Sequence, residues 1–426
     1  MTYSKIFIKK NILSWLIFIF ISSIIYFLFV KQLIYPTIIP MVRADAANIF
    51  SDWTVILQAN LCYEKGYDVF VENPCDYWNR KHVYGEILLY LPGIKTVPKF
   101  YFLILPILIN LLFIFSLVKL FTYNDNIKYF SIFVFIISPP VLLAIERANI
   151  DIIIFLSAVI ISKNKNLLFN HIIVILTTIT KFYPICLAIV FIFKKNIKKI
   201  ITNLIIVFLF ILIIMFFQFD SIIKIFDNQK QFSGYGYGVY NFSFIGTIKF
   251  INSLKIIFSN KDYTWIKYVY LCFVCIMPLI LLSIFNFKKI YNISLKGEFF
   301  HENTFENKLY IISSTIILLC YLSFSNFIYR EIFFLGLIPL LLKGEKYSNN
   351  KKFFSFYYYI LSFKFLLTTL LIYISRNDNI LPSFEPFIIT LKYTLDFYIV
   401  SIVTLTYILY VKNFIKNKYE EISSKG

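Results

Sequence analysis

The sequence predicts an all-α protein that crosses a membrane many times, and three observations support this fold class. Of the 426 residues, 59% are hydrophobic and only 15% are charged, and the mean hydropathy is +0.75. Soluble domains have roughly 45–50% apolar and about 25% charged residues. The apolar residues also form long runs, and short lysine-rich segments separate many of those runs. This combination excludes a soluble globular protein, a disordered chain and a small disulfide-stapled scaffold.

The apolar runs predict about twelve membrane helices, because a full crossing needs about 20 apolar residues. The predicted spans are 12–30, 100–121, 129–145, 152–162, 167–180, 185–193, 200–217, 265–285, 310–324, 332–342, 353–374 and 395–411. The first run is too long for the apolar part of a signal peptide, and no small-residue cleavage site follows it. We therefore expect it to remain as a membrane anchor.

The positions of the basic residues orient the chain. The net charge is +19, and the lysines gather in the breaks that lie on one side of the predicted membrane. The positive-inside rule assigns that side to the cytoplasm, together with both termini. The basic groups are Lys5, Lys9, Lys10, Lys163, Lys165, Lys194, Lys195, Lys198, Lys199, Lys288, Lys289, Lys343, Lys346, Lys351, Lys352, Lys412, Lys416 and Lys418. Topology accounts for most of the basic excess, so nucleic acid is not an expected partner.

The same orientation places three longer segments outside the cytoplasm: 31–99, 218–264 and 375–393. The first contains Cys62 and Cys75, for which an oxidising compartment permits a disulfide, and the sequence leaves this pairing open. The Cys272–Cys275 pair lacks a second ligand pair, which favours packing over metal or redox chemistry. The chain has three histidines, too few to favour a histidine-based triad or zinc site.

Three of the predicted spans are too short. The runs 152–162, 185–193 and 332–342 hold about ten apolar residues each, against the roughly 20 of a full crossing. Each follows an outside corner with ionisable residues, at 146–151, 181–184 and 329–331. If lysines hold the inner ends at the interface, the corners lie below the outer membrane surface, where charge is tolerated in a protein-walled, wet cavity.

Two less specific explanations apply to these corners. Helix caps and long side chains can reach the interface from below. Arg147 and Asp151 are four residues apart and can form an ion pair within one helix. Lys181 has no acid within one helical turn, so that explanation does not extend to it.

A shared cavity would bring together Arg147, Lys181 and Arg330. An anion would offset the repulsion between these cations, and arginine binds phosphate oxygens with two parallel hydrogen bonds. A hydrophobic groove beside them would accept a lipid tail. We therefore expect a lipid phosphate as the ligand.

The first outside segment contains a candidate catalytic acid. Asp52 opens an apolar amphipathic stretch with Trp53, so a carboxylate is expected close to the membrane face. It could accept the proton of an attacking hydroxyl while the cations stabilise a phosphate leaving group. Trp53, Tyr77 and Trp78 offer flat faces for a sugar, although such residues also mark membrane interfaces. Asp45, Glu64 and Glu72 are interpreted as solvated loop residues, and 233–238, a Gly-x-Gly repeat, as a mobile loop over the cavity.

The order of these motifs resembles the GT-C class of membrane glycosyltransferases, in particular bacterial glycosyltransferase family 87. The matching segments are Asp52, 66–70 for a Gly-x-Asp-x-Tyr-like stretch, 146–151 for an Arg-Gly-x-Asn-x-Asp-like corner, 181–184 for Lys-x-x-Pro and 326–330 for Asn-x-x-Tyr-Arg. They cover most of 45–340 in the same order. Ala148 stands where the family usually has Gly, and Phe70 where it has Tyr.

This resemblance implies a GT-C-like catalytic module at 1–343, followed by C-terminal membrane helices and a cytoplasmic tail at 344–426. It implies an inverting transfer of a sugar from a polyprenyl-monophosphate donor to a glycan or lipid acceptor, outside a bacterial cytoplasmic membrane. Asp52 would be the base, and Arg147, Lys181 and Arg330 would bind the donor phosphate. The substrate-binding candidates are Trp53, Asp68, Asp76, Asn149, Asp151 and Tyr183. No metal site or cofactor is predicted, and metal dependence stays open because members of the class differ in it.

Two other function classes remain as alternatives: a transporter or flippase for a lipid-linked glycan, and a polymerase or ligase of surface polysaccharide. Transporters favour internal repeats and broken helices at the membrane midplane, whereas the charged corners here lie near one face. A polymerase or ligase would work on diphosphate carriers. The remaining hypothesis is a non-catalytic membrane assembly factor.

Overall fold

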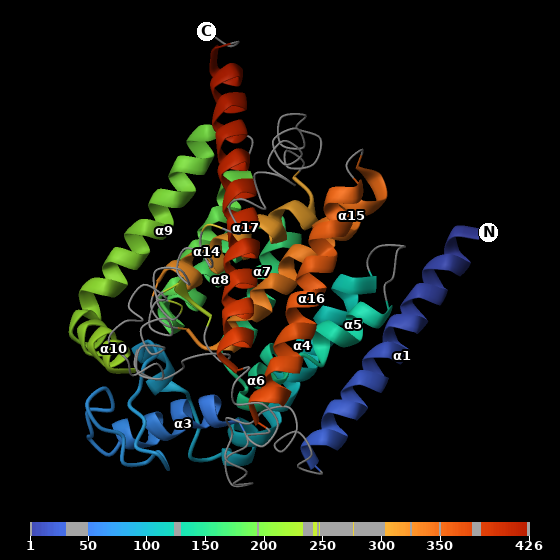
Figure 1. Ribbon diagram of the computed structural model, residues 1–426. Coiled ribbons are helices and arrows are strands. Elements are labelled where there is room, and N and C mark those ends of the chain that lie inside the picture. The colour runs from blue at the N-terminus through green and yellow to red at the C-terminus, as the bar shows by residue number, and fades with distance from the viewer. Residues whose placement is uncertain are drawn as a thin grey trace, which may run out of the picture.

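The computed structural model describes residues 2–30, 50–122, 129–193, 196–232, 242–244, 247, 276, 303–323, 326–348, 351–376 and 385–423. Helices make up most of these residues, and no β-strand element occurs among them. Figure 1 shows the helices as a bundle. In order they are α1 (Thr2–Val30), α3 (Ser51–Tyr63), η2 (Glu86–Tyr90), η3 (Phe100–Ile104), α4 (Leu105–Thr122), α5 (Tyr129–Ile136), α6 (Pro139–Arg147), α7 (Asp151–Lys163), α8 (Leu167–Thr180), η4 (Tyr183–Phe193), α9 (Ile197–Phe217), α10 (Phe219–Phe232), α14 (Phe305–Leu322), η8 (Ile328–Leu337), α15 (Ile338–Tyr347), α16 (Lys351–Arg376) and α17 (Glu385–Ser423).

The described residues have the helix lengths and composition of a helical membrane protein. Five helices are long and apolar enough to cross a membrane: Phe100–Thr122, Ile197–Phe217, Phe305–Leu322, Lys351–Leu371 and Ile389–Asn413. Three shorter apolar helices accompany them, at Ile12–Phe27, Leu167–Thr180 and Tyr183–Phe193. The all-α class predicted from the sequence is confirmed for this part of the chain. The lysines at 288–289, the Gly-rich stretch 233–238 and all of the predicted span 265–285 except Ile276 lie outside the described residues.

Some predicted spans differ from the helices that form. The run 129–145 is not one helix but two, α5 and α6, because Pro139 and Pro140 cannot continue the backbone hydrogen bonds of α5. The run 185–193 belongs to a 3₁₀ helix, η4, and the run 332–342 divides into η8 and α15. Two of the short spans at the charged corners, 185–193 and 332–342, thus contain 3₁₀ helix, whereas the third, 152–162, lies in the regular α-helix α7.

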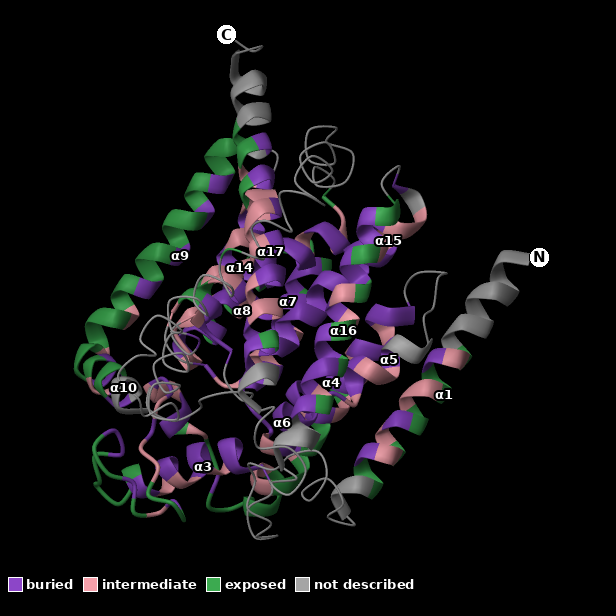
Figure 2. Ribbon diagram, in the orientation of Figure 1, coloured by how far each residue is buried: buried purple, intermediate pink, exposed green. Residues whose placement is uncertain are grey.

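α14 lies at the centre of the bundle. Of the five long apolar helices it is the most enclosed, with 67% of its apolar window buried. It packs against η8, η4, α7, α15 and α17. Gly336 of η8 allows this close approach, because a Cβ there would lie 2.0 Å from the Ser313 hydroxyl oxygen of α14. α9, by contrast, is mostly exposed at the edge of the bundle, as Figure 2 shows. An apolar helix exposed in this way suits contact with lipid.

The first loop forms a small folded unit at one end of the bundle, away from the C-terminus (Figure 1). α3 and η2 pack on each other within it. Its apolar side chains, among them Trp53, Ile56 and Leu57, are buried and form a second core with Ala148 and Ile150 of the corner after α6. The loop is thus held rigidly against the helices that carry the predicted site.

Gly85 fixes the contact between this loop and α8. The Gly85 amide donates to the Thr180 carbonyl (3.0 Å) at the end of α8. A Cβ on Gly85 would lie 1.7 Å from the Ile179 carbonyl oxygen, so the backbones approach more closely than any other residue allows. Tyr84 is thereby placed beside Lys181, which follows α8 directly.

Candidate functional site

Asp52 is held in place by groups from the corner after α6. The residue lies in the first turn of α3, where the helix dipole favours a carboxylate. Arg147 Nη1 donates to Asp52 Oδ1 (3.0 Å), and Asn149 Nδ2 donates to Asp52 Oδ2 (2.6 Å). The Phe50 amide also donates to the Glu146 carbonyl (3.0 Å), which ties the start of α3 to the end of α6. Both carboxylate oxygens of Asp52 therefore have a fixed direction.

The backbone around Asp52 is strained. Among the described residues, three that are not glycine adopt the left-handed conformation: Phe50 (φ 63°), Asn79 (φ 51°) and Ala148 (φ 44°). Phe50 precedes Asp52 by two positions, Asn79 precedes Arg80, and Ala148 lies between Arg147 and Asn149. Strain of this kind gathers where the surrounding fold holds functional groups in place. Asn79 and Ala148 thus flank residues that contact the Asp52 carboxylate, and Phe50 lies just before Asp52 itself.

A second charged group is centred on Asp151, the first residue of α7. Lys181 Nζ donates to Asp151 Oδ1, and the Tyr183 hydroxyl donates to the same oxygen (2.8 Å). Arg330 Nε lies 3.5 Å from Asp151 Oδ2. The partner of Lys181, which has no acid within a turn of its own helix, is thus a carboxylate 30 residues earlier in the chain. Two cations face one carboxylate here, so this group keeps one positive charge in excess.

The two carboxylates belong to one site. Asn149 connects them, because its amide nitrogen donates to Asp52 while its side-chain oxygen accepts from the Asp151 backbone amide (2.9 Å). Tyr84 lies between them, with Lys181 Nζ 5.6 Å from the centre of its ring. The pKa of Tyr84 is raised well above its usual value, first by burial and then by the charges of Asp52 and Asp151. The Tyr84 hydroxyl therefore stays protonated and available as a donor.

The cations present more surface than the carboxylate they surround. The side chain of Asp151 is fully buried, whereas those of Lys181, Arg330 and Arg147 are 11%, 16% and 20% exposed. Asp52 itself is 11% exposed. An anion approaching the Asp151 group would therefore meet Lys181 and Arg330 before the buried carboxylate.

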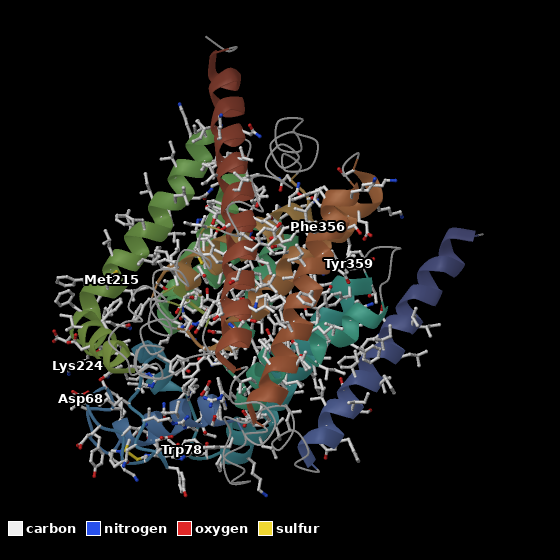
Figure 3. All side chains as sticks on the ribbon, viewed as in Figure 1. Asp68, Trp78, Met215, Lys224, Phe356 and Tyr359 are labelled. Carbon is white, nitrogen blue, oxygen red and sulfur yellow. A yellow bond between two sulfur atoms is a disulfide. The ribbon has the colours of Figure 1, made fainter. Side chains whose placement is uncertain are left out.

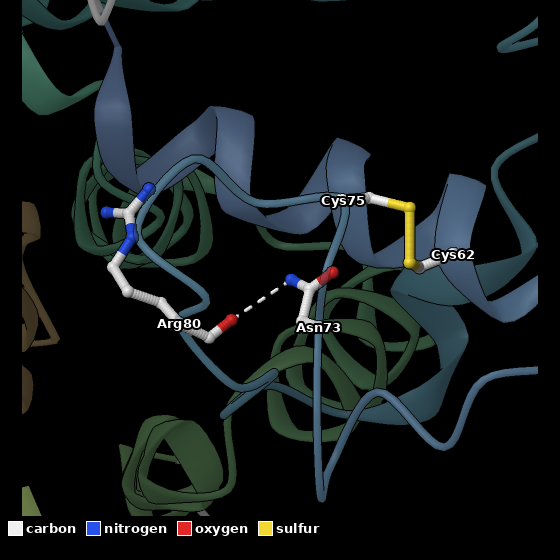
Figure 4. Close-up of a disulfide and its surroundings, with 4 residues drawn as sticks. All are labelled: Cys62, Asn73, Cys75 and Arg80. Atoms are coloured by element: carbon white, nitrogen blue, oxygen red, sulfur yellow. Dashed lines mark hydrogen bonds between the residues drawn. A yellow bond between two sulfur atoms is a disulfide. The ribbon is translucent and has the colours of Figure 1, made fainter.

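Arg80 is a site residue that the sequence analysis did not identify. Its guanidinium makes hydrogen bonds to both oxygens of Asp76 (2.8 and 3.0 Å) and to the Ser51 carbonyl (2.9 Å), and Nη1 lies 3.9 Å from Asp52 Oδ1. Asp76, predicted to bind substrate, is buried beneath Arg80 and orients it. A disulfide joins Cys62 to Cys75, directly before Asp76, and Asn73 donates to the Arg80 carbonyl (3.0 Å) (Figure 4). No motif spacing pointed to Arg80; only a census of every arginine near a carboxylate would have found it.

Two predicted substrate-binding residues have other contacts. Trp53 is 5% exposed and its indole donates to the Tyr101 carbonyl (2.8 Å), so its ring faces are enclosed in the core of the loop. Asp68 lies at the edge of the loop, where it forms an exposed ion pair with Lys224 of α10 (2.7 Å) (Figure 3). The structure brings together Asp52, Arg147, Asn149, Asp151, Lys181, Tyr183 and Arg330, but not Trp53 or Asp68.

An apolar groove lies at the end of α8. It has a volume of about 200 Å³ and lies between the end of α8, the start of η4, and α9 with α10. Its lining is Thr178, Ile179, Phe182, Ile185, Ile211, Ile214, Met215, Ile222 and Phe226. One lining residue, Phe182, directly follows Lys181 in the chain. Among the described residues, no set of three or more metal-ligating side chains comes together.

Comparisons of the chain with models of protein families, with curated proteins and with solved structures gave no match.

Proposed function

We propose that the protein is an inverting membrane glycosyltransferase with a GT-C-like fold of about twelve membrane helices, which uses a polyprenyl-monophosphate sugar as donor. The observation that carries the proposal is the arrangement around Asn149. A fixed carboxylate, Asp52, lies on one side of it, and a group with excess positive charge lies on the other. An apolar groove is lined by Phe182, the residue that follows Lys181 in the chain. A lipid phosphate sugar needs these three elements: a base, a phosphate site and a place for the chain.

The reaction follows from this arrangement. An acceptor hydroxyl attacks the anomeric carbon of the donor sugar, and its proton passes to Asp52. The bond between the anomeric carbon and the phosphate oxygen breaks, and its electron pair leaves with the polyprenyl monophosphate. Lys181 and Arg330 stabilise the negative charge that grows on this phosphate, while Asp151 and Tyr183 hold Lys181 in place. Attack opposite the leaving group inverts the anomeric configuration.

The groove supports a lipid rather than a soluble sugar nucleotide as donor. Its walls are almost entirely hydrocarbon, and it borders α9, one of the five long apolar helices, and the shorter apolar helix α8. Its lining residue Phe182 follows Lys181 in the chain. Each buried CH₂ of a chain contributes about 0.8 kcal/mol. The head group of such a lipid would reach Lys181 while the first isoprenoid units occupy the groove.

Two substitutions test the proposal on the purified protein in nanodiscs. Asp52→Asn preserves the hydrogen bond from Arg147 but cannot take a proton, so sugar transfer from a polyprenyl-phosphate donor should fall by at least 10³-fold, with little change in donor affinity. Lys181→Ala should weaken donor binding about tenfold or more. Asp68→Asn, at the exposed pair with Lys224, is the matched carboxylate control and should retain transfer.

Lipids that copurify with the protein separate the function classes. Mass spectrometry should find a polyprenyl monophosphate, with or without its sugar. A diphosphate carrier would favour a polymerase or ligase, and full transfer by Asp52→Asn would remove Asp52 as the base. Vesicle experiments in which the lipid-linked glycan crosses the bilayer without transfer would identify a flippase.

A further inference from the structure

A second group of charges is buried behind Arg330, apart from the site described above. It consists of Glu331 from η8, Lys364 from α16, and Lys392 and Asp396 from α17; we call it the buried charge cluster. Lys364 Nζ lies 2.6 Å from Glu331 Oε2 and 2.7 Å from Asp396 Oδ1. Lys392 Nζ lies 2.6 Å from Asp396 Oδ2 and 3.4 Å from Glu331 Oε1. The two cations and two carboxylates form a closed ring.

The ring is enclosed within apolar helices. The four side chains are at most 1% exposed, and Lys364 Nζ lies 5.2 Å from the centre of the Phe334 ring. Removing four charges from water is costly, and buried ion pairs of this kind often add no net stability over hydrophobic residues of similar size. Their best-attested use is to specify one register between packed elements. The cluster therefore fixes how η8, α16 and α17 lie against each other.

The cluster is connected to the site through consecutive residues of η8. Glu331 follows Arg330, and in a 3₁₀ helix with three residues per turn their side chains point about 120° apart. Glu331 points to the cluster, whereas Arg330 points to Asp151 on α7 and packs over the Tyr183 ring (5.1 Å). Fixing Glu331 thus fixes the rotation and height of η8, and with them the guanidinium of Arg330.

We propose that Glu331, Lys364, Lys392 and Asp396 are positioning residues, which hold η8 so that Arg330 stays beside Asp151 and Lys181. The catalytic consequence rests on the proposed function, but the structural one does not. Any ligand that uses Arg330 depends on two C-terminal helices that do not contribute a side chain to the site itself among the described residues.

The experiment compares the wild-type protein with a neutral variant, Glu331→Gln, Lys364→Met, Lys392→Met and Asp396→Asn. Because every charge of the ring is removed, the variant leaves no unpaired charge and is expected to fold. Hydrogen–deuterium exchange in nanodiscs should be at least tenfold faster in 327–337, with α9 unchanged. The control removes the ion pair at the far end of α14 and α15, Glu306→Gln with Lys343→Met, and should leave 327–337 unchanged.

A second measurement separates positioning from general stability. The neutral variant should lower kcat/KM for the donor about tenfold, and Arg330→Ala should add less than twofold in that background, because Arg330 is already displaced. Lys364→Met and Lys364→Arg form a further pair: the conservative arginine should keep the exchange of 327–337 within twofold of wild type, and methionine should not.

Unchanged exchange in 327–337 would overturn the proposal. So would an acceleration of equal size in α9, which would mark the cluster as a general stabiliser. If the neutral variant does not fold, the exchange of 327–337 is compared between Lys364→Met and Lys364→Arg instead. Equal exchange in these two variants would overturn the proposal. If the wild-type protein transfers no sugar, the proposed function fails, whereas the exchange measurement still decides whether the cluster positions η8.

Discussion

Ala148 shows how one residue reports on the constraints of the site. It lies in the left-handed region (φ 44°, ψ 48°) at the end of α6, between two residues that bind Asp52. A glycine adopts this conformation without the Cβ clash that costs other residues about 1–2 kcal/mol.

Ala148→Gly should therefore raise the free energy of unfolding by about 1 kcal/mol. Thermal unfolding in detergent measures the change. The matched control is Ala158→Gly in the middle of α7, where the helical backbone reverses the sign and the loss should be about 1 kcal/mol. Two destabilising effects would mean that the left-handed backbone at Ala148 carries no strain.

His82 makes the folding of the first loop depend on pH. Its ring is fully buried between Phe70 and Tyr84, and burial lowers its pKa from 6.5 to about 4. Between pH 6.5 and about 4, the His82 ring binds a proton in the unfolded chain but not in the folded protein. Stability is therefore complete above pH 6.5 and falls as the pH drops towards 4, by up to about 3 kcal/mol.

The measurement is chemical unfolding of the protein at pH 7.5, 5.5 and 4.5, with intrinsic fluorescence as the probe. His82→Phe removes the titrating group and should flatten the difference between pH 7.5 and 4.5 relative to wild type. His171, on α8, is the control position, and His171→Phe should leave the pH dependence in place. Identical slopes for wild type and His82→Phe would contradict a neutral buried His82.

Some contacts of the site could be predicted from the sequence, and others could not. Asp52, Arg147 and Asn149 were predicted as site residues from the order of motifs, and the structure brings them into contact. The pairing of Lys181 with Asp151 was not predicted, because the two residues lie on different helices. Arg80 and Lys364 were missed because each is a single charged residue without a spacing that distinguishes it.

Among the helices, the long apolar α-helices could be predicted from composition. The 3₁₀ helices, whose geometry depends on packing, could not. The long spans α9 and α16 follow from apolar length alone. The separation of α5 from α6 follows from Pro139 and Pro140, a signal that the span prediction overlooked. The 3₁₀ geometry of η4 and η8 has no such local signal, since it is set by close packing against α14.

The disulfide is the main covalent constraint on the first loop. It closes 13 positions between the end of α3 and the segment that carries Asp76 and Arg80. Closing a loop of about 15 residues stabilises a fold by about 3 kcal/mol. Cys62→Ser with Cys75→Ser should therefore make 64–80 more sensitive to an added protease, and should lower the proposed sugar transfer because Arg80 loses its support.

Limited proteolysis with mass spectrometry measures the cleavage sites and rates. Cys186→Ser removes a free cysteine from η4 and serves as the control, with no expected change in the loop. Equal protection of 64–80 in the double variant and the control would show that Asp76, Arg80 and Asn73 hold the segment without the disulfide.

In the molecule as a whole, the buried charge cluster joins the two predicted parts, 1–343 and 344–426. Glu331 belongs to the first part, whereas Lys364, Lys392 and Asp396 belong to the second. α14 also packs against α17, and the Tyr310 hydroxyl lies 2.8 Å from the Thr406 hydroxyl across this contact. The two parts thus share buried charges and a common core.

A chain cut between 348 and 349 tests whether the first part folds alone. Residues 1–348 on their own would leave Glu331 buried without its two lysines, and an unpaired buried charge of this kind destabilises by about 3–5 kcal/mol. We therefore expect this fragment to be degraded or aggregated when expressed alone, as measured by fluorescence-detected size exclusion. Coexpression with 349–426 should restore a monodisperse peak, because the missing charges return with α16 and α17.

The control is the same fragment with Glu331→Gln, which has no unpaired buried charge. This fragment should depend less on 349–426, and its recovery when expressed alone should rise. A monodisperse 1–348 with wild-type Glu331 would show that the first part is an independent domain and that the cluster is not required for its fold.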